Sequence, residues 1–272
     1  MKSLQGKVAV VTGGGGNGIG HCLVNELAKR GAHVAYCDIA GLESTQQSIR
    51  PYAVKSYAEI VDISDRAAIK GFVKNVISEF GHADIIINNA GIALGDRSFD
   101  QVTEEDFDRI TDINYWGVIH TTQQFYPNLL TRPEAAIVNI SSSQGIMSLP
   151  YLVPYCTTKF AVRGFTDTLR VENKIRGIKN ISIHTVHPGA VATNITLNAD
   201  YQGSSTQKFH ENLQAGTSPQ RAAEIICDGV LKNKARIFIS DGRLHDWAAR
   251  LLPTQYDKII RFVMKLKGVE VV

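Results

Sequence analysis

A glycine-rich turn near the N-terminus constrains the fold of this chain more than any other stretch. Residues 7–12 are expected to form a strand whose central residues 8–11 are all apolar, which is typical of the middle of a parallel sheet. Helical periodicity then runs to Gly31, and a second short strand closes on Asp38. Between the first strand and the helix stand Gly13, Gly14, Gly15, Gly16, Asn17, Gly18, Ile19 and Gly20. A strand, a glycine turn, a helix and a strand in this order predict the first unit of a doubly wound parallel sheet.

This first unit has the features of a dinucleotide site. Glycines let the backbone approach a pyrophosphate closely, and the N-terminus of the next helix offers it free N–H groups. Asp38 lies eighteen residues after Gly20, where a carboxylate can accept hydrogen bonds from the ribose hydroxyls of adenosine. An alternative is that Asp38 only caps the helix that follows it. The expected contacts from the turn itself are Gly14, Asn17, Gly18, Ile19 and Gly20.

Asp38 also indicates which cofactor is bound. A carboxylate at this position would repel the 2′-phosphate of NADP, and no arginine or lysine occurs among residues 39–42 to attract it. Asn17 in the turn is neutral as well. The sequence therefore predicts NAD as the cofactor.

The same alternation of strand and helix continues along the chain. Further strands are expected at 56–61, 84–87, 136–140, 181–186 and 236–240. Further helices are expected at 42–50, 67–80, 104–130, 155–176 and 219–231. This pattern predicts an α/β fold, a doubly wound parallel sheet of about seven strands with helices on both faces, the Rossmann fold. Residues 1–243 are expected to form this dinucleotide-binding and catalytic domain.

Two strand ends supply further candidate contacts to the cofactor. Asp62 and Ile63 follow the third strand and would lie beside an adenine ring, although Asp62 or Ser64 could instead cap the next helix. After the fourth strand, small and amide residues suit a backbone that lies against a flat cofactor, and they are equally consistent with a plain turn. These residues are Asn89, Ala90 and Gly91.

Ser142, Tyr155 and Lys159 carry the candidate chemistry. Tyr155 and Lys159 would lie one helical turn apart on the same face. A nearby ammonium favours the phenolate and would lower the tyrosine pKa from its usual value of about 10, while a serine hydroxyl could polarise a carbonyl or alkoxide oxygen. The alternative is a surface tyrosine and a solvated lysine. Asn114, inside the helix at 104–130, is either a core amide bonded to backbone or an amide that holds a water near the lysine.

These motifs, taken in order, resemble those of the short-chain dehydrogenase/reductase family. The turn from Thr12 to Gly20 is similar to the family's T-G-x-x-x-G-x-G, with one residue more between Thr12 and Gly18. Asp62, the N-N-A-G segment at 88–91, Asn114, and Ser142 thirteen residues before Y-x-x-x-K also fit the family pattern. A P-G-x-V-x-T segment completes the match with Pro188, Gly189, Val191 and Thr193.

The resemblance implies a role for each of the candidate catalytic residues. Tyr155 would be the general acid/base, and Lys159 would hold the nicotinamide ribose and lower the pKa of Tyr155. Ser142 would bond the substrate oxygen, and Asn114 would keep a water in a proton relay that reaches Lys159. The family also implies a homo-dimer or homo-tetramer through the helices at 104–130 and 155–176. Further contacts to the cofactor would come from Tyr155, Lys159, Pro188, Gly189, Val191 and Thr193.

Composition and charge argue against several other classes of protein. The formal net charge is only +3, so no nucleic-acid partner is expected. The four cysteines form no C-x-x-C pair and no zinc-type cluster with histidine, which predicts reduced thiols and no metal site. No segment reads as a signal peptide or a membrane span, which predicts a cytoplasmic protein.

The substrate site is less determined by the sequence. Residues 194–216 follow the sixth strand and predict a mobile lid. The candidate pocket residues are mostly apolar, which favours an apolar secondary alcohol or ketone as the small-molecule substrate. They are Leu94, Gln144, Met147, Leu149, Leu152 and Leu197.

Residues 244–272 are expected to form a C-terminal helical extension. One helical face carries an apolar stripe, and lysines and arginines lie elsewhere on the helix. We expect this stripe to pack on its own domain or on a neighbouring subunit, with contact to a membrane surface as the less favoured alternative. The stripe consists of Ile259, Ile260, Phe262, Val263 and Leu266.

Two other functions compete with an NAD-dependent alcohol dehydrogenase or carbonyl reductase. A 3-oxoacyl-thioester reductase of the same family would usually use NADPH, against which Asp38 argues. A non-catalytic regulator that senses NAD would be expected to lose the tyrosine or the lysine, and this chain keeps both Tyr155 and Lys159.

Overall fold

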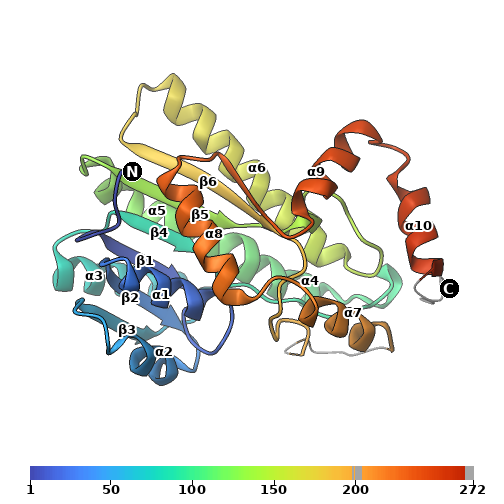
Figure 1. Cartoon of the computed structure of the whole chain (residues 1–272), viewed down its shortest axis with the longest axis horizontal. Coiled ribbons are helices and arrows are strands. Elements are labelled where there is room, and N and C mark those ends of the chain that lie inside the picture. The colour runs from blue at the N-terminus through green and yellow to red at the C-terminus, as the bar shows by residue number, and fades with distance from the viewer. Residues whose placement is uncertain (198, 200–203, 267–272) are drawn as a thin grey trace.

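The protein folds around a seven-stranded parallel sheet, as the sequence predicts. The structure is a computed structural model and describes residues 1–197, 199 and 204–266. The strands pair in the order β3-β2-β1-β4-β5-β6-β7, so the winding reverses between β1 and β4 (Figure 1). In doubly wound sheets the ligand binds at the carboxyl ends of the strands beside such a reversal. The strands are β1 Val8–Thr12, β2 His33–Asp38, β3 Ser56–Ile60, β4 Ile85–Asn88, β5 Ala135–Ile140, β6 Ile181–Pro188 and β7 Arg236–Ile239.

Helices cover both faces of the sheet and form two separate cores. One core packs α1 and α8 on the sheet through Leu23 and Ile226, and the other packs α3 and α5 through Phe72 and Phe125. Strands buried on both faces lack polar alternation, which explains the continuous apolar runs in the sequence. The helices are α1 Ile19–Lys29, α2 Leu42–Ile49, α3 Arg66–Phe80, α4 Glu104–Thr111, α5 Gly117–Leu130, α6 Val153–Ile175, α7 Ser204–Gln214, α8 Pro219–Leu231, α9 Gly242–Leu251 and α10 Tyr256–Leu266.

The helix expected at 104–130 is continuous but not uniform. It begins with a capping box, in which Thr103 and Asp106 bond each other's backbone N–H groups. Between α4 and α5 lies a π-helical turn, η2, at Asp112–Trp116. This turn contains the fully buried Asn114.

Two alternative interpretations of the sequence are wrong, and both concern helix caps. Asp65, rather than Asp62 or Ser64, caps α3 by accepting hydrogen bonds from the N–H groups of its first turn. Asp62 instead accepts hydrogen bonds from Ser64. Asp38 does not cap α2, whose N-cap is Gly41 with no side-chain hydrogen bond.

The segment expected as a lid, residues 194–216, contains α7. The residues that flank this segment, Val191 and Thr217, form a parallel bridge with each other. Inside it, the Thr196 hydroxyl and His210 Nδ1 are 2.8 Å apart. Residues 198 and 200–203 of the expected lid lie outside the described residues.

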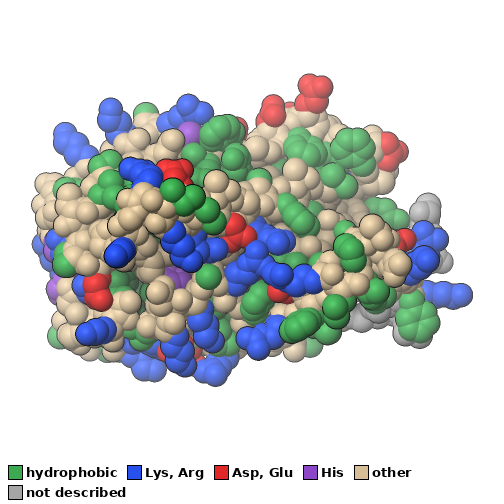
Figure 2. Space-filling view, turned by 90° about the horizontal axis from the view of Figure 1, so that it is seen from above, with side chains coloured by type: hydrophobic (Ala, Val, Ile, Leu, Met, Phe, Trp, Pro, Cys, Tyr) green, Lys and Arg blue, Asp and Glu red, His purple; other side chains and the backbone are tan. Residues whose placement is uncertain are grey.

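The C-terminal extension consists of α9 and α10 and differs from the expectation. Helix α9 packs against β7 and the short 3₁₀ turn η3, Ser143–Gly145. Helix α10 stands away from the body of the fold (Figures 1 and 2), and Ile259 and Phe262 of its apolar stripe are exposed. The prediction that these two side chains pack on their own domain is therefore wrong, because both remain exposed. The side chains of Val263 and Leu266, and residues 267–272, lie outside the described residues.

No helix in the described part of the chain combines the length and the apolar character needed to cross a bilayer.

Candidate active site

The glycine turn holds the start of α1 tightly against the sheet. A Cβ atom at Gly20 would lie 1.8 Å from the carbonyl oxygen of Gly13, so only glycine fits this contact. Asn89 donates its side-chain amide to the carbonyls of Thr12 and Gly13, at 3.1 and 3.0 Å. The end of β4 thereby fixes the position of the turn.

The remaining glycines divide into two groups. Gly14 and Gly15 face the protein, because a Cβ there would lie 2.8 Å from Tyr36 Cβ or 2.2 Å from the Ala40 carbonyl oxygen. A Cβ at Gly16 or Gly18 would meet open space. Gly14 and Gly15 thus pack on the protein, while Gly16 and Gly18 leave an open side.

The N-terminus of α1 faces this open side. Its N-cap is Gly18, and no side chain caps the helix. The first N–H groups of a helix need acceptors, and an anion supplies them well. This arrangement fits the pyrophosphate of a dinucleotide.

Asp38 joins the glycine turn to the end of β2. Its two carboxylate oxygens accept hydrogen bonds from the backbone N–H groups of Gly15, at 2.9 Å, and Ile39, at 2.8 Å. A carboxylate has about four acceptor positions, so this half-buried group keeps capacity for ribose hydroxyls. The sequence did not single out Gly15, whose only signal is its place in the glycine run.

The other residues expected at the adenosine end differ in exposure. Asn17 and Asp62 are exposed, and Ile63 is buried. A Cβ at Gly117 would lie 2.6 Å from Ile63 Cδ1, so the start of α5 packs directly on this side chain.

Asn114 and Lys159 approach each other across Gly91. A Cβ at Gly91 would lie 3.0 Å from Asn114 Oδ1 and 3.2 Å from Lys159 Nζ. Asn114 accepts a hydrogen bond from the N–H of Ile92 and donates to its carbonyl oxygen, and it also donates to the Thr158 hydroxyl. Asn114 is therefore a buried amide bonded to backbone, and it lies beside the lysine. Nearby, the Thr12 hydroxyl accepts hydrogen bonds from the N–H groups of Asn89 and Ala90.

Ser142 lies where β5 ends and η3 begins. Its hydroxyl donates to Gln144 Oε1 at 2.5 Å and accepts from the Gln144 N–H at 3.2 Å. His187 Nδ1 lies 3.0 Å from the Ser142 carbonyl oxygen, and the His187 ring stacks on Phe238. Burial lowers the pKa of His187 to about 4, so a neutral imidazole holds the backbone of Ser142.

Tyr155 and Lys159 lie one turn apart in the first turns of α6. The Lys159 ammonium lies 5.6 Å from the centre of the Tyr155 ring and donates to the Ile140 carbonyl oxygen at 3.2 Å. Burial lowers the pKa of Lys159 to about 8. Lys159 is buried and Tyr155 is half-buried, so the interpretation of Lys159 as a solvated lysine is wrong.

The pKa of Tyr155 moves in the direction opposite to the expected one. Burial raises it to about 12, and a hydrogen bond with Ser142 only partly opposes this rise. The expected lowering by Lys159 is absent because the ammonium is directed to the Ile140 carbonyl and because burial penalises the phenolate.

The segment after β6 begins beside Ser142. The Pro188 carbonyl oxygen lies 3.5 Å from the Ser142 hydroxyl. The N–H of Gly189 bonds the Ile239 carbonyl of β7, and the N–H of Thr193 bonds the carbonyl of the buried Val191. This segment leads from the carboxyl end of the sheet to α7.

The candidate pocket residues lie in the segments that follow β4, β5 and β6. Leu94 and Met147 are buried, Leu149 and Leu152 are half-buried, and Leu197 is exposed. Of the six, Gln144 is the one that the hydrogen bonds bring to Ser142.

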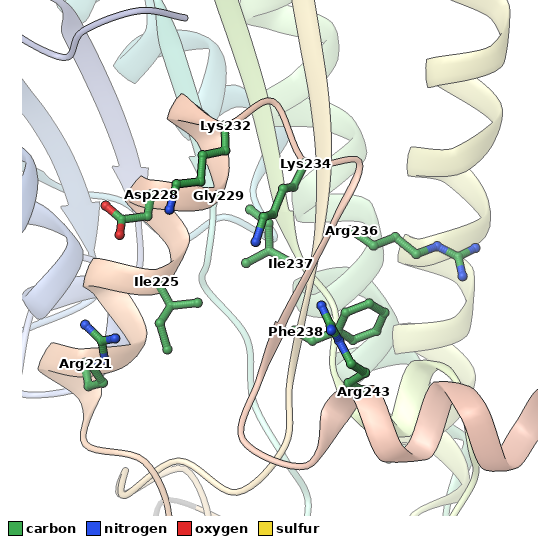
Figure 3. A pocket seen from close by; sticks show the side chains of 10 residues that line it. All are labelled: Arg221, Ile225, Asp228, Gly229, Lys232, Lys234, Arg236, Ile237, Phe238 and Arg243. Carbon is green, nitrogen blue, oxygen red and sulfur yellow. The ribbon is translucent and has the colours of Figure 1, made fainter.

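Two cavities lie outside this site. One, of about 210 Å³, lies between α8 and β7 and is strongly basic (Figure 3). Its charged lining consists of Arg221, Asp228, Lys232, Lys234, Arg236 and Arg243. The other, of about 380 Å³, is lined by residues of α1 and α8 and by Tyr52. Neither cavity is lined by a candidate catalytic residue.

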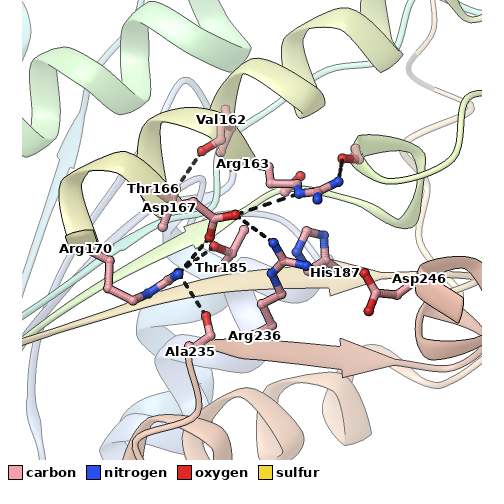
Figure 4. A network of polar contacts seen from close by, with 12 residues as sticks. Val162, Arg163, Thr166, Asp167, Arg170, Thr185, His187, Ala235, Arg236 and Asp246 are labelled. Carbon is pink, nitrogen blue, oxygen red and sulfur yellow. Dashed lines mark hydrogen bonds and ion pairs between the residues drawn. The ribbon is translucent and has the colours of Figure 1, made fainter. Parts of the chain in front are cut away.

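An ion-pair network ties α6 to β7 and α9 (Figure 4). Asp167 pairs with Arg170 at 2.7 Å and with Arg236 at 2.8 Å, and Arg236 also pairs with Asp246 of α9 at 3.3 Å. Arg163, on the same helix as Asp167, donates to the carbonyl of Gly145 in η3. Sequence reasoning missed this network, because Asp167 and Arg236 are 69 residues apart and no local spacing connects them.

Comparison with known proteins identifies the class that this fold and site define. The family model described as short chain dehydrogenase matches residues 7–202. The putative oxidoreductase SadH of Mycobacterium tuberculosis is 33% identical over 267 residues, covering 96% of each chain. Rat (Rattus norvegicus) 17-beta-hydroxysteroid dehydrogenase 13 is 32% identical over 240 residues, covering 88% of this chain and 76% of that protein.

A solved structure gives the same result for the fold. The crystal structure of a short chain dehydrogenase/reductase from Burkholderia phymatum in complex with NAD matches with a TM-score of 0.84 at 22% identity, covering 95% of this chain and 96% of that one. The chain belongs to the short-chain dehydrogenase/reductase family. It is thus an oxidoreductase with a Rossmann fold.

Proposed function

We propose that this protein transfers a hydride between NAD and an apolar secondary alcohol or the corresponding ketone, with Tyr155 as general acid/base. One observation carries the proposal: the buried Lys159 ammonium lies 5.6 Å from the centre of the Tyr155 ring, and the Ser142 hydroxyl acts on the pKa of Tyr155. The hydroxyls of Ser142 and Tyr155 and the ammonium of Lys159 can together stabilise a substrate oxygen that gains or loses a proton.

The four side chains have separate roles in this proposal. With a pKa of about 12, Tyr155 is protonated at neutral pH and donates its proton to the ketone oxygen, which leaves a phenolate. In the oxidation direction this phenolate takes the hydroxyl proton and becomes the neutral phenol again. Ser142, oriented by Gln144, bonds the same oxygen. Lys159 supplies a positive charge beside the phenol, and Asn114 with Thr158 fixes the path by which a water would reach it.

The nicotinamide cofactor, when bound, accepts or supplies the hydride at the substrate carbon. The uncapped N-terminus of α1 at Gly18 would bind its pyrophosphate, and Asp38 would bind its adenosine ribose. The candidate contacts at its nicotinamide end are Asn89, Ala90, Gly91, Tyr155, Lys159, Pro188, Gly189, Val191 and Thr193.

Asp38 supports NAD over NADP. Its charge is close to where a 2′-phosphate would lie, and no described lysine or arginine pairs with it. We expect Asp38→Ala to weaken NAD binding by about 10- to 100-fold, which corresponds to a lost hydrogen bond to a charged group of about 1.5–3 kcal/mol. Discrimination against NADP should relax as well, and calorimetric titration with both cofactors measures this.

A matched variant separates charge from shape at this position. Asp38→Asn keeps an acceptor for the Gly15 N–H and removes the charge, so it should admit NADP while holding the glycine turn. A wild-type protein that already prefers NADP would overturn the cofactor assignment.

The substrate class rests on the apolar character of Leu94, Met147, Leu149, Leu152 and Leu197. The name of the rat relative, a hydroxysteroid dehydrogenase, agrees with an apolar secondary alcohol. We propose that the segment at 194–216 acts as a lid over these side chains. A homo-oligomer in the cytoplasm completes the proposal.

The function is tested by following the reduced nicotinamide formed from a panel of secondary alcohols, with NAD and with NADP. The panel spans short alcohols, long-chain hydroxy compounds and sterols. Tyr155→Phe should lower kcat by about 10²–10⁴-fold, the usual contribution of general acid–base catalysis, and leave NAD affinity nearly unchanged. Tyr52→Phe, which alters a tyrosine outside the site, is the control and should keep full activity.

Three outcomes of this panel separate the proposal from its alternatives. Unchanged turnover in Tyr155→Phe overturns the mechanism. No turnover in the panel, together with turnover of a 3-oxoacyl thioester assayed separately with NADPH, favours the thioester reductase. Silence across the panel with NAD binding intact favours the NAD-sensing regulator.

A further inference from the structure

Helix α9 is oriented with its apolar face outward. Leu244, Trp247 and Leu251 are spaced to share one face of the helix and are 68%, 59% and 69% exposed. The opposite face turns Asp246 inward, where it pairs with Arg236 of β7 (Figure 4). A surface helix of a globular protein normally does the reverse. The apolar face of α9 is therefore left without a partner inside the described chain.

Helix α10, the next helix along the chain, also exposes apolar side chains. Ile259 and Phe262 are 43% and 63% exposed and lie three residues apart, on one face of the helix. Lys258, Arg261 and Lys265 are exposed beside them. We call the exposed apolar side chains of α9 and α10, with the neighbouring lysines and arginines, the C-terminal surface.

The positive charge of the whole protein is concentrated at this end. Residues 1–241 contain 23 lysines and arginines and 23 aspartates and glutamates, so they carry no formal net charge. Residues 242–272 contain six lysines and arginines against three acidic residues. The entire formal charge of +3 therefore resides in the C-terminal extension, and in Figure 2 basic and hydrophobic side chains stand together at the end of the molecule that carries α10.

This charge distribution decides which partner fits the surface. A second copy of the chain would bring two patches of the same net positive charge together in a two-fold contact, which repel each other. An anionic lipid surface attracts the same cations and receives the apolar side chains, and tryptophan favours the boundary between lipid and water. We propose that the C-terminal surface docks the protein on membranes that contain anionic lipid.

The location of the surface gives docking a consequence for the site. Helix α9 packs against η3, which follows Ser142 directly, and both C-terminal helices stand beyond the carboxyl end of the sheet (Figure 1). A docked molecule brings this end of the fold to the lipid. Delivery of an apolar substrate from the bilayer rests on the proposed function, whereas docking itself does not.

The test is flotation of the full chain with phosphatidylcholine vesicles that contain phosphatidylserine, compared with vesicles of phosphatidylcholine alone. We expect binding to the anionic vesicles and loss of binding at high salt, because salt screens exposed charges. The charge variant Lys258→Glu/Arg261→Glu should lower partitioning at least about tenfold, since each basic residue near an anionic surface contributes on the order of 1 kcal/mol. The apolar variant Trp247→Ala/Phe262→Ala should lower it as well.

Matched controls carry the same changes on other exposed helix surfaces. Lys70→Glu/Lys74→Glu on α3 repeats the charge reversal, and Val171→Ala/Ile175→Ala on α6 repeats the apolar truncation; both should bind as the wild type does. Failure of the wild type to float with anionic vesicles overturns the proposal, and so does equal loss in the controls. If the wild type does not float and the two C-terminal variants shift a dimer to monomer, the occupant is a second copy. Flotation is measured without turnover, so this result is independent of the proposed activity.

Discussion

Helices α1 and α9 are both amphipathic, and they face the protein with opposite sides. Helix α1 buries Leu23 and Leu27 against the sheet. Helix α9 exposes Trp247 and Leu251 and directs Asp246 towards Arg236. The first helix covers the middle of the sheet, where two neighbouring strands offer an apolar surface, whereas the second follows β7 at the edge, where an ion-pair network is the available surface.

This difference shows what helical periodicity can and cannot predict. The period of 3.6 residues predicts that a stripe exists on both helices. Whether the apolar or the polar stripe faces inward depends on whether the sheet offers apolar or charged side chains beneath the helix. Substitutions in the two helices should therefore have very different effects on stability.

The largest effect is expected from Leu23→Ala in α1. Leu23 is fully buried, and truncation of a buried leucine leaves a cavity that costs about 2–5 kcal/mol in the free energy of unfolding. Urea denaturation measures this change. The matched truncation Leu251→Ala in α9 should stay within about 0.5 kcal/mol, as for other exposed positions. Equal losses in the two variants would mean that α9 buries its apolar face after all.

Helix α6 adds a third case to the comparison of α1 and α9, because it buries the charged side chain of Lys159. The pKa of this lysine falls from 10.5 to about 8 in the folded protein, so between these values the unfolded chain holds a proton that the folded protein has released. The free energy of unfolding rises with pH wherever the unfolded state binds more protons. We therefore expect Lys159 to contribute a rise from about pH 8 to pH 10.5, with a slope of at most about 1.4 kcal/mol for each pH unit.

Lys159→Met should remove this rise from the pH profile of stability. Lys174→Met changes an exposed lysine of the same helix and should keep the wild-type profile. Above pH 10, Tyr155 acts in the other direction, because its pKa is raised from 10 to about 12 and the folded state then binds the extra proton. Parallel profiles for the wild type and Lys159→Met would show that the lysine is solvated in the folded protein.

Apart from the control substitutions, the smallest effect is expected from Asp246→Asn, which removes the inward charge of α9. Asp246 pairs with Arg236 at 3.3 Å and with Arg250 at 3.0 Å. Loss of these charged hydrogen bonds should cost about 1–2 kcal/mol, less than Leu23→Ala and more than the control Leu251→Ala. Glu224→Gln breaks the more exposed ion pair with Arg221 and should change stability by under about 1 kcal/mol. An Asp246→Asn protein as stable as the wild type would remove the reason for the orientation of α9.

The fold could be predicted from the sequence because its strands are buried on both faces. Runs such as Val8–Thr12 and Ile85–Asn88 contain almost no polar positions, and glycine turns separate them from helical stripes. The choice of Asp65 over Asp62 as the cap of α3 was not predictable, since both lie near the helix start and three-dimensional register decides between them. The outward orientation of α9 was not predictable for the same kind of reason.

In the candidate site, too, some features could be predicted from local sequence and others could not. The spacing of Ser142, Tyr155 and Lys159 indicated which side chains would meet, because a strand end and one helical turn fix their separations. The predicted lowering of the Tyr155 pKa was wrong. The direction of this shift depends on the burial of the tyrosine and on which carbonyl the lysine faces. Neither property has a signal in local sequence.

The number of residues in the π-helical turn η2 affects the direction in which Asn114 points. A π turn is equivalent to one residue inserted into an α-helix, and each residue rotates an α-helix by about 100°. Helices α4 and α5 are therefore out of phase with each other, and Asn114 lies where the phase changes. Shortening this turn by one residue would restore regular helical hydrogen bonds and rotate the amide away from Ile92 and Thr158. The number of residues between the capping box at Thr103 and Asn114 thus sets the direction of the amide as firmly as the identity of the side chain does.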